Sequence, residues 1–258
     1  MERGPAFLPD WRDAAAYAQL LVADRAILAW EWLRRVPAYR HDFERSGTSG
    51  DGDGAARWGL HRFEAPALAA PHARPLWTAA AMAPVLAVSA RQAGEEAGID
   101  LTALGALLTS HIRRGSDHVL LSDGWHLLRL DVAGARVRAG ALALALRVAL
   151  PGPPALRPTL LALRRLEALL RLGRFCAALH PPEARAARRI QVLRTADALA
   201  VGASQREIAR NLLGGHVDVP GWRDEHPHVR LRAQRLVREA RSFLAGGYRS
   251  LLMPPRGC

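Results

Sequence analysis

The sequence contains no lysine, so each of its 36 basic residues is an arginine. A complete lack of lysine is typical of a GC-rich genome, and the arginine bias alone therefore indicates nothing about function. The excess of positive charge is more informative. A formal net charge of +12 and a pI of about 11.3 favour polyanionic partners, nucleic acid first and an anionic membrane surface second.

Cysteine and long apolar runs are also scarce. Two cysteines, Cys176 and Cys258, cannot form a disulfide framework, which fits a reducing compartment. The N-terminus lacks the apolar core of a signal peptide. The longest apolar run, 78–90, is too short to cross a bilayer and contains Pro84. We therefore expect a cytoplasmic protein with no membrane partner.

Motifs for phosphate loops and metal sites are missing as well. The "DGDG" at 51–54 has no lysine after it and no strand before it, so it does not resemble a nucleotide-binding loop. His226 and His228 lie close together, but they have no cysteine partner and no clear third ligand. The sequence therefore predicts no metal and no cofactor.

Helices are expected at the N-terminus. Residues 9–43 predict two or three short helices, with Asp10 and Asp24 as N-caps. Four aromatic side chains in this segment are expected to be core residues of a small helical unit: Trp11, Tyr17, Trp30 and Trp32. Residues 46–56, "SGTSGDGDGAA", are typical of a flexible linker.

Strands are expected in the middle of the chain. Residues 117–140 predict antiparallel strands, with turns at 122–124 and 133–134. Leucine and valine at 128, 130 and 132 alternate with Leu127, Arg129 and Asp131, which predicts a sheet with one solvent-exposed face.

Helices return after Pro158. Leu163, Leu166 and Leu170 form an apolar face that is expected to be core, with a dimer seam as the alternative. A further helix is expected before Gly202. The fold class is therefore mainly α with a small antiparallel β element. Its expected parts are an N-terminal unit at 1–77, a connecting region at 78–150 and a helical DNA-binding domain at 151–258.

The stretch "ASQREIARNLLGG" at 203–215 has the pattern of a capped helix. Ser204 and Glu207 form the S-x-x-E capping box, and Gly214 is a natural stop. Ile208, Ala209 and Leu212 share one face. A small alanine beside a branched apolar residue is what the first helix of a helix-turn-helix needs, because it lets the next helix pack closely.

A second helix is expected at 227–245. Its helical phase separates two faces. On the apolar side lie Val229, Ala233, Leu236, Val237, Ala240 and Leu244. On the other lie Leu231, Gln234, Arg235, Arg238 and Arg241. Arginine and glutamine are the side chains that bind guanine and adenine edges in the major groove. The plain alternative is a solvated arginine face. The capped helix before it and the net charge of +7 over residues 183–258 favour DNA binding.

The predicted motif departs from a standard helix-turn-helix, because residues 214–227 replace the usual tight turn. We therefore expect a variant in which this segment acts as a wing and Trp222 pins it to the core. Gln234 and Arg235 are candidates for base contacts, and Arg206, Arg210, Arg238 and Arg241 for phosphate contacts. Gln205, His228 and Arg230 complete the candidate DNA-binding residues.

The chain also resembles a known family. Residues 183–252, and more loosely 117–182, resemble a bacterial helix-turn-helix family common on integrative and conjugative elements. The matching stretches are "ASQREIARNLLG" and "RLRAQRLVREARSFLAGGYRSLL". At the N-terminus, "LPDWRDAAAYAQLL", "RAILAWEWLRRVPAYR" and "RWGLHRFE" resemble a transcriptional-regulator-like domain. Together the two resemble FseA-type activators.

That resemblance implies transcription activation through double-stranded DNA, at genes for excision and transfer of a mobile element. It also implies contacts to RNA polymerase and to an antiactivator protein. Residues 1–45 carry no net positive charge and many aromatic residues. They are therefore expected to be dispensable for DNA binding and needed for activation.

Two other functions compete with this prediction. One is an antiactivator-type interaction module that makes no DNA contact. The other is a DNA strand-transfer enzyme of the tyrosine recombinase class, suggested by "HIRR" at 111–114 and by Tyr248. Because the histidine and arginines of such a motif occur often by chance in an arginine-rich chain, we expect no enzyme. Tyr248 is instead expected to anchor the last helical turn.

Overall fold

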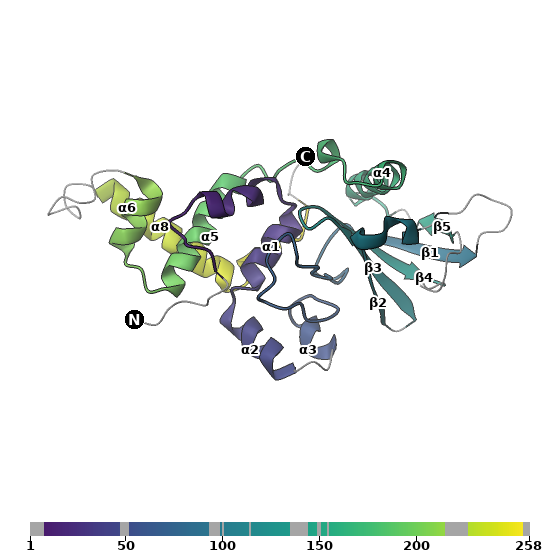
Figure 1. Ribbon diagram of the computed structural model, residues 1–258, viewed down its shortest axis with the longest axis horizontal. Coiled ribbons are helices and arrows are strands. Elements are labelled where there is room, and N and C mark those ends of the chain that lie inside the picture. The colour runs from purple at the N-terminus through teal and green to yellow at the C-terminus, as the bar shows by residue number, and fades with distance from the viewer. Residues whose placement is uncertain are drawn as a thin grey trace. The chain divides into compact units, whose positions relative to one another are not determined.

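A computed structural model of the chain is shown in Figure 1. It describes residues 8–46, 52–92, 99, 101–113, 115–134, 144–148, 151–153, 155–214 and 227–254. The chain forms two compact units. The first, which we call the helical unit, comprises Met1–Ala23 and Pro182–Tyr248. The second, the sheet unit, comprises Asp24–Pro181 and Arg249–Cys258. The expected boundaries at 77 and 150 do not coincide with this division.

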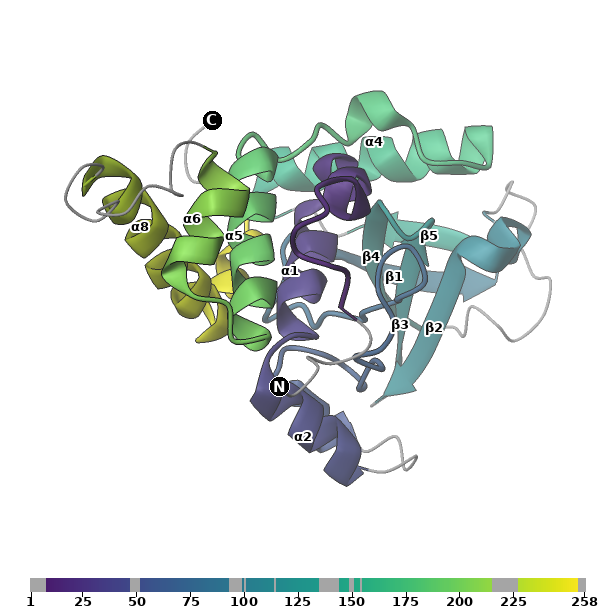
Figure 2. The same ribbon diagram turned by 60° about the vertical axis from the view of Figure 1, so that its left-hand side comes forward.

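The helical unit combines an N-terminal segment of the chain with Pro182–Tyr248. Its elements are η1 (Ala15–Val22), α5 (Ala186–Ala200), α6 (Gln205–Leu213) and α8 (Pro227–Leu244). Helix α8 packs against both α5 and α6, and η1 packs against α5. Figures 1 and 2 both show α5, α6 and α8 side by side. The short helix η4 (Gly247–Leu251) follows α8.

The sheet unit contains one five-stranded sheet in the order β2-β3-β4-β1-β5. Its strands are β1 (Leu86–Gln92), β2 (Leu108–Arg113), β3 (Ser116–Ser122), β4 (Leu127–Ala133) and β5 (Leu144–Val148). The strands at 116–122 and 127–133 confirm the prediction of strands in this region. The sheet is mixed and not antiparallel, because β1 pairs in parallel with β4 while its other edge pairs antiparallel with β5.

Helices and loops complete the sheet unit. The helices are α1 (Arg25–Leu33), α2 (Pro37–Ser46), α3 (Gly52–Ala56), η2 (Leu101–Leu107), α4 (Leu156–Leu172) and η3 (Ala177–Leu179). The core lies between the sheet and α4, where Leu166 is buried and Leu163 and Leu170 are partly buried. This confirms the core assignment of the α4 leucines. About half of the described residues are helical.

The expected solvent-exposed sheet face is wrong. Arg129 on β4 is 0% exposed, although its position in the alternation predicts exposure. Its guanidinium donates to the carbonyl oxygens of Trp77 (2.8 Å), Val119 (2.6 Å) and Leu130 (3.1 Å). These acceptors satisfy N–H donors of the buried guanidinium. Burial of this cation without hydrogen bonds would lower the stability of the fold. The non-helical segment before β1 supplies Trp77 and covers this face.

The N-terminal aromatic residues are core residues, as expected, but of two different units. Trp11 and Tyr17 are buried in the helical unit, and Trp30 and Trp32 in the sheet unit. Asp24 precedes α1 without a side-chain cap hydrogen bond. Its carboxylate instead accepts from the Leu127 N–H (2.9 Å) and from the His180 ring (3.0 Å).

Two further findings concern the linker and the membrane. Residues 52–56 of the predicted linker form helix α3, and residues 47–51 lie outside the described residues. Among the described helices, none has the length and apolar character needed to cross a bilayer.

Candidate nucleic-acid interface

The start of α6 is fixed by a complete capping box. The Glu207 N–H donates to Ser204 Oγ (3.2 Å), and the Ser204 N–H donates to Glu207 Oε2 (2.8 Å). The second bond also lowers the pKa of the Glu207 carboxyl, because it stabilises the charged form. Two backbone donors at this helix start are thus satisfied, which confirms the predicted cap.

The end of α6 is equally defined. Gly214 follows Leu213 with a φ of 61°, a conformation that favours glycine. The Gln191 side chain on α5 donates from Nε2 to the Leu212 carbonyl (2.8 Å), which supplies a partner for one carbonyl of the last turn. The helix is therefore held at its start by neighbouring residues and at its end by a side chain from α5.

The apolar face of α8 is buried as its helical phase predicts. Val229, Ala233, Leu236, Val237 and Ala240 are all buried, and Leu244 is half-buried. Ala209 of α6 packs with Val229 and Ala233 in one cluster, with Leu213 at its edge. Small side chains on both helices let α6 and α8 approach closely.

The opposite face of α8 is exposed. Arg235, Arg238 and Arg241 are exposed, and Leu231 on the same face is 46% exposed. Within the described part of the chain, these three arginines form no hydrogen bond or ion pair. Their positive charge is therefore not neutralised by the described carboxylates of the protein.

The arginines of α5 are used differently. Arg188 pairs with Glu239 of α8 (2.7 Å), and Arg189 lies over the Phe243 ring at 4.7 Å. Arg194 donates to the carbonyl oxygen of Trp11 (2.8 Å). These arginines stabilise the helical unit, whereas Arg235, Arg238 and Arg241 make no such contact with the described residues.

The remaining candidate residues lie on the same two helices. Gln205, Arg206 and Arg210 are exposed on α6, and His228 is exposed at the start of α8. Arg230 and Gln234 are partly buried. The structure thus brings all nine candidates onto two packed helices. The proposed wing at 215–226, with Trp222 and His226, lies outside the described residues.

The N-terminal segment contributes to this unit, which the sequence did not indicate. Trp11 is buried in one cluster with Ala198, Ile208 and Val237, and therefore touches the core beneath α6 and α8. The Tyr17 hydroxyl donates to the buried Asp197 carboxylate (2.7 Å). The expectation that residues 1–45 are dispensable for DNA binding assumed a separate N-terminal unit, which residues up to Ala23 do not form.

The structure gives no support to a tyrosine nucleophile. The Tyr248 side chain is 1% exposed, so it would not reach a phosphate without local unfolding. Its burial matches the expected role of an anchor for the last helical turns. Arg114 of the "HIRR" stretch lies outside the described residues.

Helical DNA-binding domains often place a recognition helix with exposed polar and basic side chains against a second helix. Comparison with known families agrees. Residues 149–253 match the family described as "T6SS, Transcription factor, DNA binding domain", of the RovC type. Residues 10–63 match the proteobacterial transcriptional regulator-like domain. No curated protein and no solved structure matches the chain. The chain is thus a DNA-binding transcriptional regulator.

Proposed function

We propose that α6 and α8 form a variant helix-turn-helix in which α8 enters the major groove and binds a specific sequence. The observation that carries this proposal is the division of α8 into a largely buried apolar face and an exposed face whose arginines have no partner among the described residues. A guanidinium can bind guanine O6 and N7 with two hydrogen bonds. The exposed Leu231 can contact a thymine methyl group on the same face.

Within this arrangement the nine residues have different roles. Arg235 and Gln234 lie in the first half of α8, the part of a recognition helix that contacts base edges. Arg238 and Arg241 lie further along, and Arg206 and Arg210 lie on α6, where phosphate oxygens are nearer. Gln205, His228 and Arg230 flank these groups at the two helix starts.

We further propose that the protein activates genes for excision and transfer of a mobile element, by contacting RNA polymerase and under control of an antiactivator. The resemblance of the N-terminal and C-terminal stretches to FseA-type activators supports this role. A protein that acts on bacterial DNA in this way works in the cytoplasm. The alternative of an antiactivator without DNA contact does not require an exposed arginine face.

Genome-wide mapping of bound sites in the source bacterium, followed by a promoter reporter, tests this function. We expect one dominant site upstream of mobile-element genes and higher reporter output when the protein is present. A protein that occupies no specific site but lowers the output of another activator would instead be an antiactivator.

A further inference from the structure

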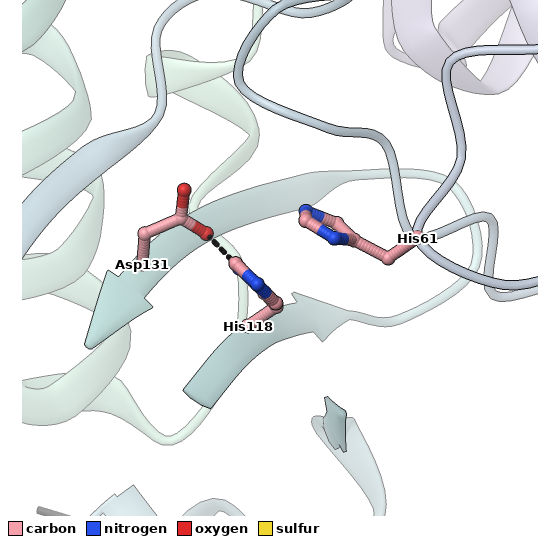
Figure 3. A group of neighbouring side chains, drawn as sticks. All are labelled: His61, His118 and Asp131. Atoms are coloured by element: carbon pink, nitrogen blue, oxygen red, sulfur yellow. Dashed lines mark hydrogen bonds and ion pairs between the residues drawn. The ribbon is translucent and has the colours of Figure 1, made fainter. Parts of the chain in front are cut away.

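Three side chains of types that can ligate a metal ion come together in the sheet unit. None of them belongs to α6 or α8. They are His61, His118 on β3 and Asp131 on β4 (Figure 3). One ligand atom from each lies within 4.8 Å of the other two. His118 and Asp131 are direct partners in the β3–β4 register, so the sheet itself brings them together.

His61 comes from a separate segment and lies over the strands. Its ring stacks on that of His118, with centroids 3.6 Å apart and an interplanar angle of 22°. The residue is only 8% exposed, and its Nε2 atom is buried with no hydrogen-bond partner within the described part of the chain. A buried ring nitrogen without a partner carries a desolvation cost that a bound cation would remove.

Asp131 is held in place for such a role. His118 Nδ1 lies 2.7 Å from its Oδ1 atom, and Arg129 Nη2 donates to the same oxygen at 2.9 Å. Arg129 is in turn fixed by backbone carbonyls. In many metal sites, hydrogen bonds from neighbouring groups orient a ligating carboxylate in this way. The positive charge of Arg129 weakens the attraction of this carboxylate for a cation.

We propose that His61, His118 and Asp131 bind one divalent transition-metal ion of the zinc class. Two imidazoles and one carboxylate suit Zn²⁺, with water in the fourth position. Because the two rings are stacked, they must rotate apart for both to coordinate one ion in the ring plane.

Binding of the ion would join the segment around His61 to β3 and β4. His61 lies beside the isolated bridge between Leu60 and Trp77, and Trp77 also accepts from Arg129. The site thus links the non-helical segment that covers the sheet to the strands beneath it. Nothing in the sequence indicates this site, because positions 61, 118 and 131 do not have the spacing of a metal-binding motif.

Cobalt titration of the full chain tests this site directly. After removal of metals with a chelator, Co²⁺ is added and its visible absorption is followed, and Zn²⁺ is then added as competitor. We expect one equivalent of Co²⁺ to give a saturable band that Zn²⁺ abolishes. Absence of a saturable band in the wild-type protein would overturn the proposal.

Variants locate the site. His61→Ala and Asp131→Asn should each weaken binding at least about tenfold, in line with the loss of metal ligands or their partners. His72→Ala is the matched control, because His72 is an exposed histidine of the same unit, and it should bind as the wild type does. If His61→Ala unfolds, the milder His61→Gln replaces it. Unchanged affinity in a folded His61 variant contradicts the assignment.

Discussion

Single residues decide whether α6 forms at all. A nine-residue helix is too short to be stable alone in water, so its ends and its packing must hold it. Ser204 and Glu207 satisfy donors at the first turn, while Gln191 from α5 reaches the last one. Residues with no part in DNA contact thus set the position of those that we expect to bind DNA.

Ser204→Ala tests the cap. The substitution removes the acceptor of the Glu207 N–H, and we expect the free energy of unfolding of the helical unit to fall by about 1 kcal/mol. Thermal or denaturant unfolding of wild type and variant measures this difference. Ser204→Asp, which keeps a capping oxygen, should restore most of it. Equal stability of the alanine variant and the wild type would show that the cap contributes nothing.

Trp11→Ala tests the contribution of the N-terminal segment. The ring is 2% exposed against Ala198, Ile208 and Val237, so its removal leaves a cavity in the core of the helical unit. We expect a loss of about 3–5 kcal/mol in the free energy of unfolding, together with weaker DNA binding.

Val22→Ala is the matched control for Trp11→Ala. Val22 lies on η1 in the same segment but is 52% exposed, and its loss should leave stability nearly unchanged. If Trp11→Ala is as stable as Val22→Ala, the N-terminal segment is not part of the core, and the original expectation of a dispensable N-terminus returns.

At the scale of elements, α6 and α8 could be predicted because their signals are local. Helix α6 has a capping box and a closing glycine, and both helices have an apolar stripe. Both helices were found where the sequence predicts them. Strands β1, β2 and β5 were missed, although Gly115, with a φ of 81°, lies in the turn between β2 and β3. The parallel pairing of β1 with β4 joins residues more than forty positions apart, as with Leu86 and Leu130.

The candidate DNA-binding face of α8 could likewise be predicted from the sequence. The contacts that hold the helical unit together beneath it could not. Helical phase separates Arg235 from Leu236 without any knowledge of the fold. No local pattern indicates that Trp11 fills the core below α8, or that Arg194 binds the Trp11 carbonyl. Burial of Arg129 was missed for the same reason, because its acceptor on Trp77 comes from a distant segment.

Arg241→Ala tests the phosphate role of the later part of α8. Loss of one phosphate contact should weaken binding to specific and random DNA alike and lower the salt dependence of log Kobs by about one unit of slope. Titration of both DNAs at several salt concentrations measures this. Arg171→Ala, which removes a 63% exposed arginine side chain of the sheet unit, serves as control and should change neither value. A slope unchanged by Arg241→Ala would place this residue away from the DNA backbone.

At the scale of the whole molecule, the two family matches do not follow the two compact units. The regulator-like match at 10–63 and the DNA-binding match at 149–253 each contribute residues to both units. Fragments cut at 63 or at 149 would therefore remove part of a core, as the burial of Trp11 shows for the helical unit. Functional tests of DNA binding consequently need the full chain.

The positive charge is concentrated in the part of the chain that forms most of the helical unit. Residues 183–258, which supply most of the helical unit, carry a net charge of +7, whereas residues 1–60 carry −1. Much of the positive charge on α5 is paired internally, so the exposed arginines of α8 are the side chains best placed to meet phosphates and bases.

Selection of bound sequences from a randomised duplex library, with the wild type and with folded Arg235→Ala, tests most directly whether α8 binds a specific sequence. We expect the wild type to enrich one motif. The variant should enrich the same motif with relaxed preference at one base pair, where loss of a bidentate contact costs about 1–3 kcal/mol. Enrichment of no motif by the wild type, or of identical motifs by both proteins, would contradict base recognition by Arg235 on α8.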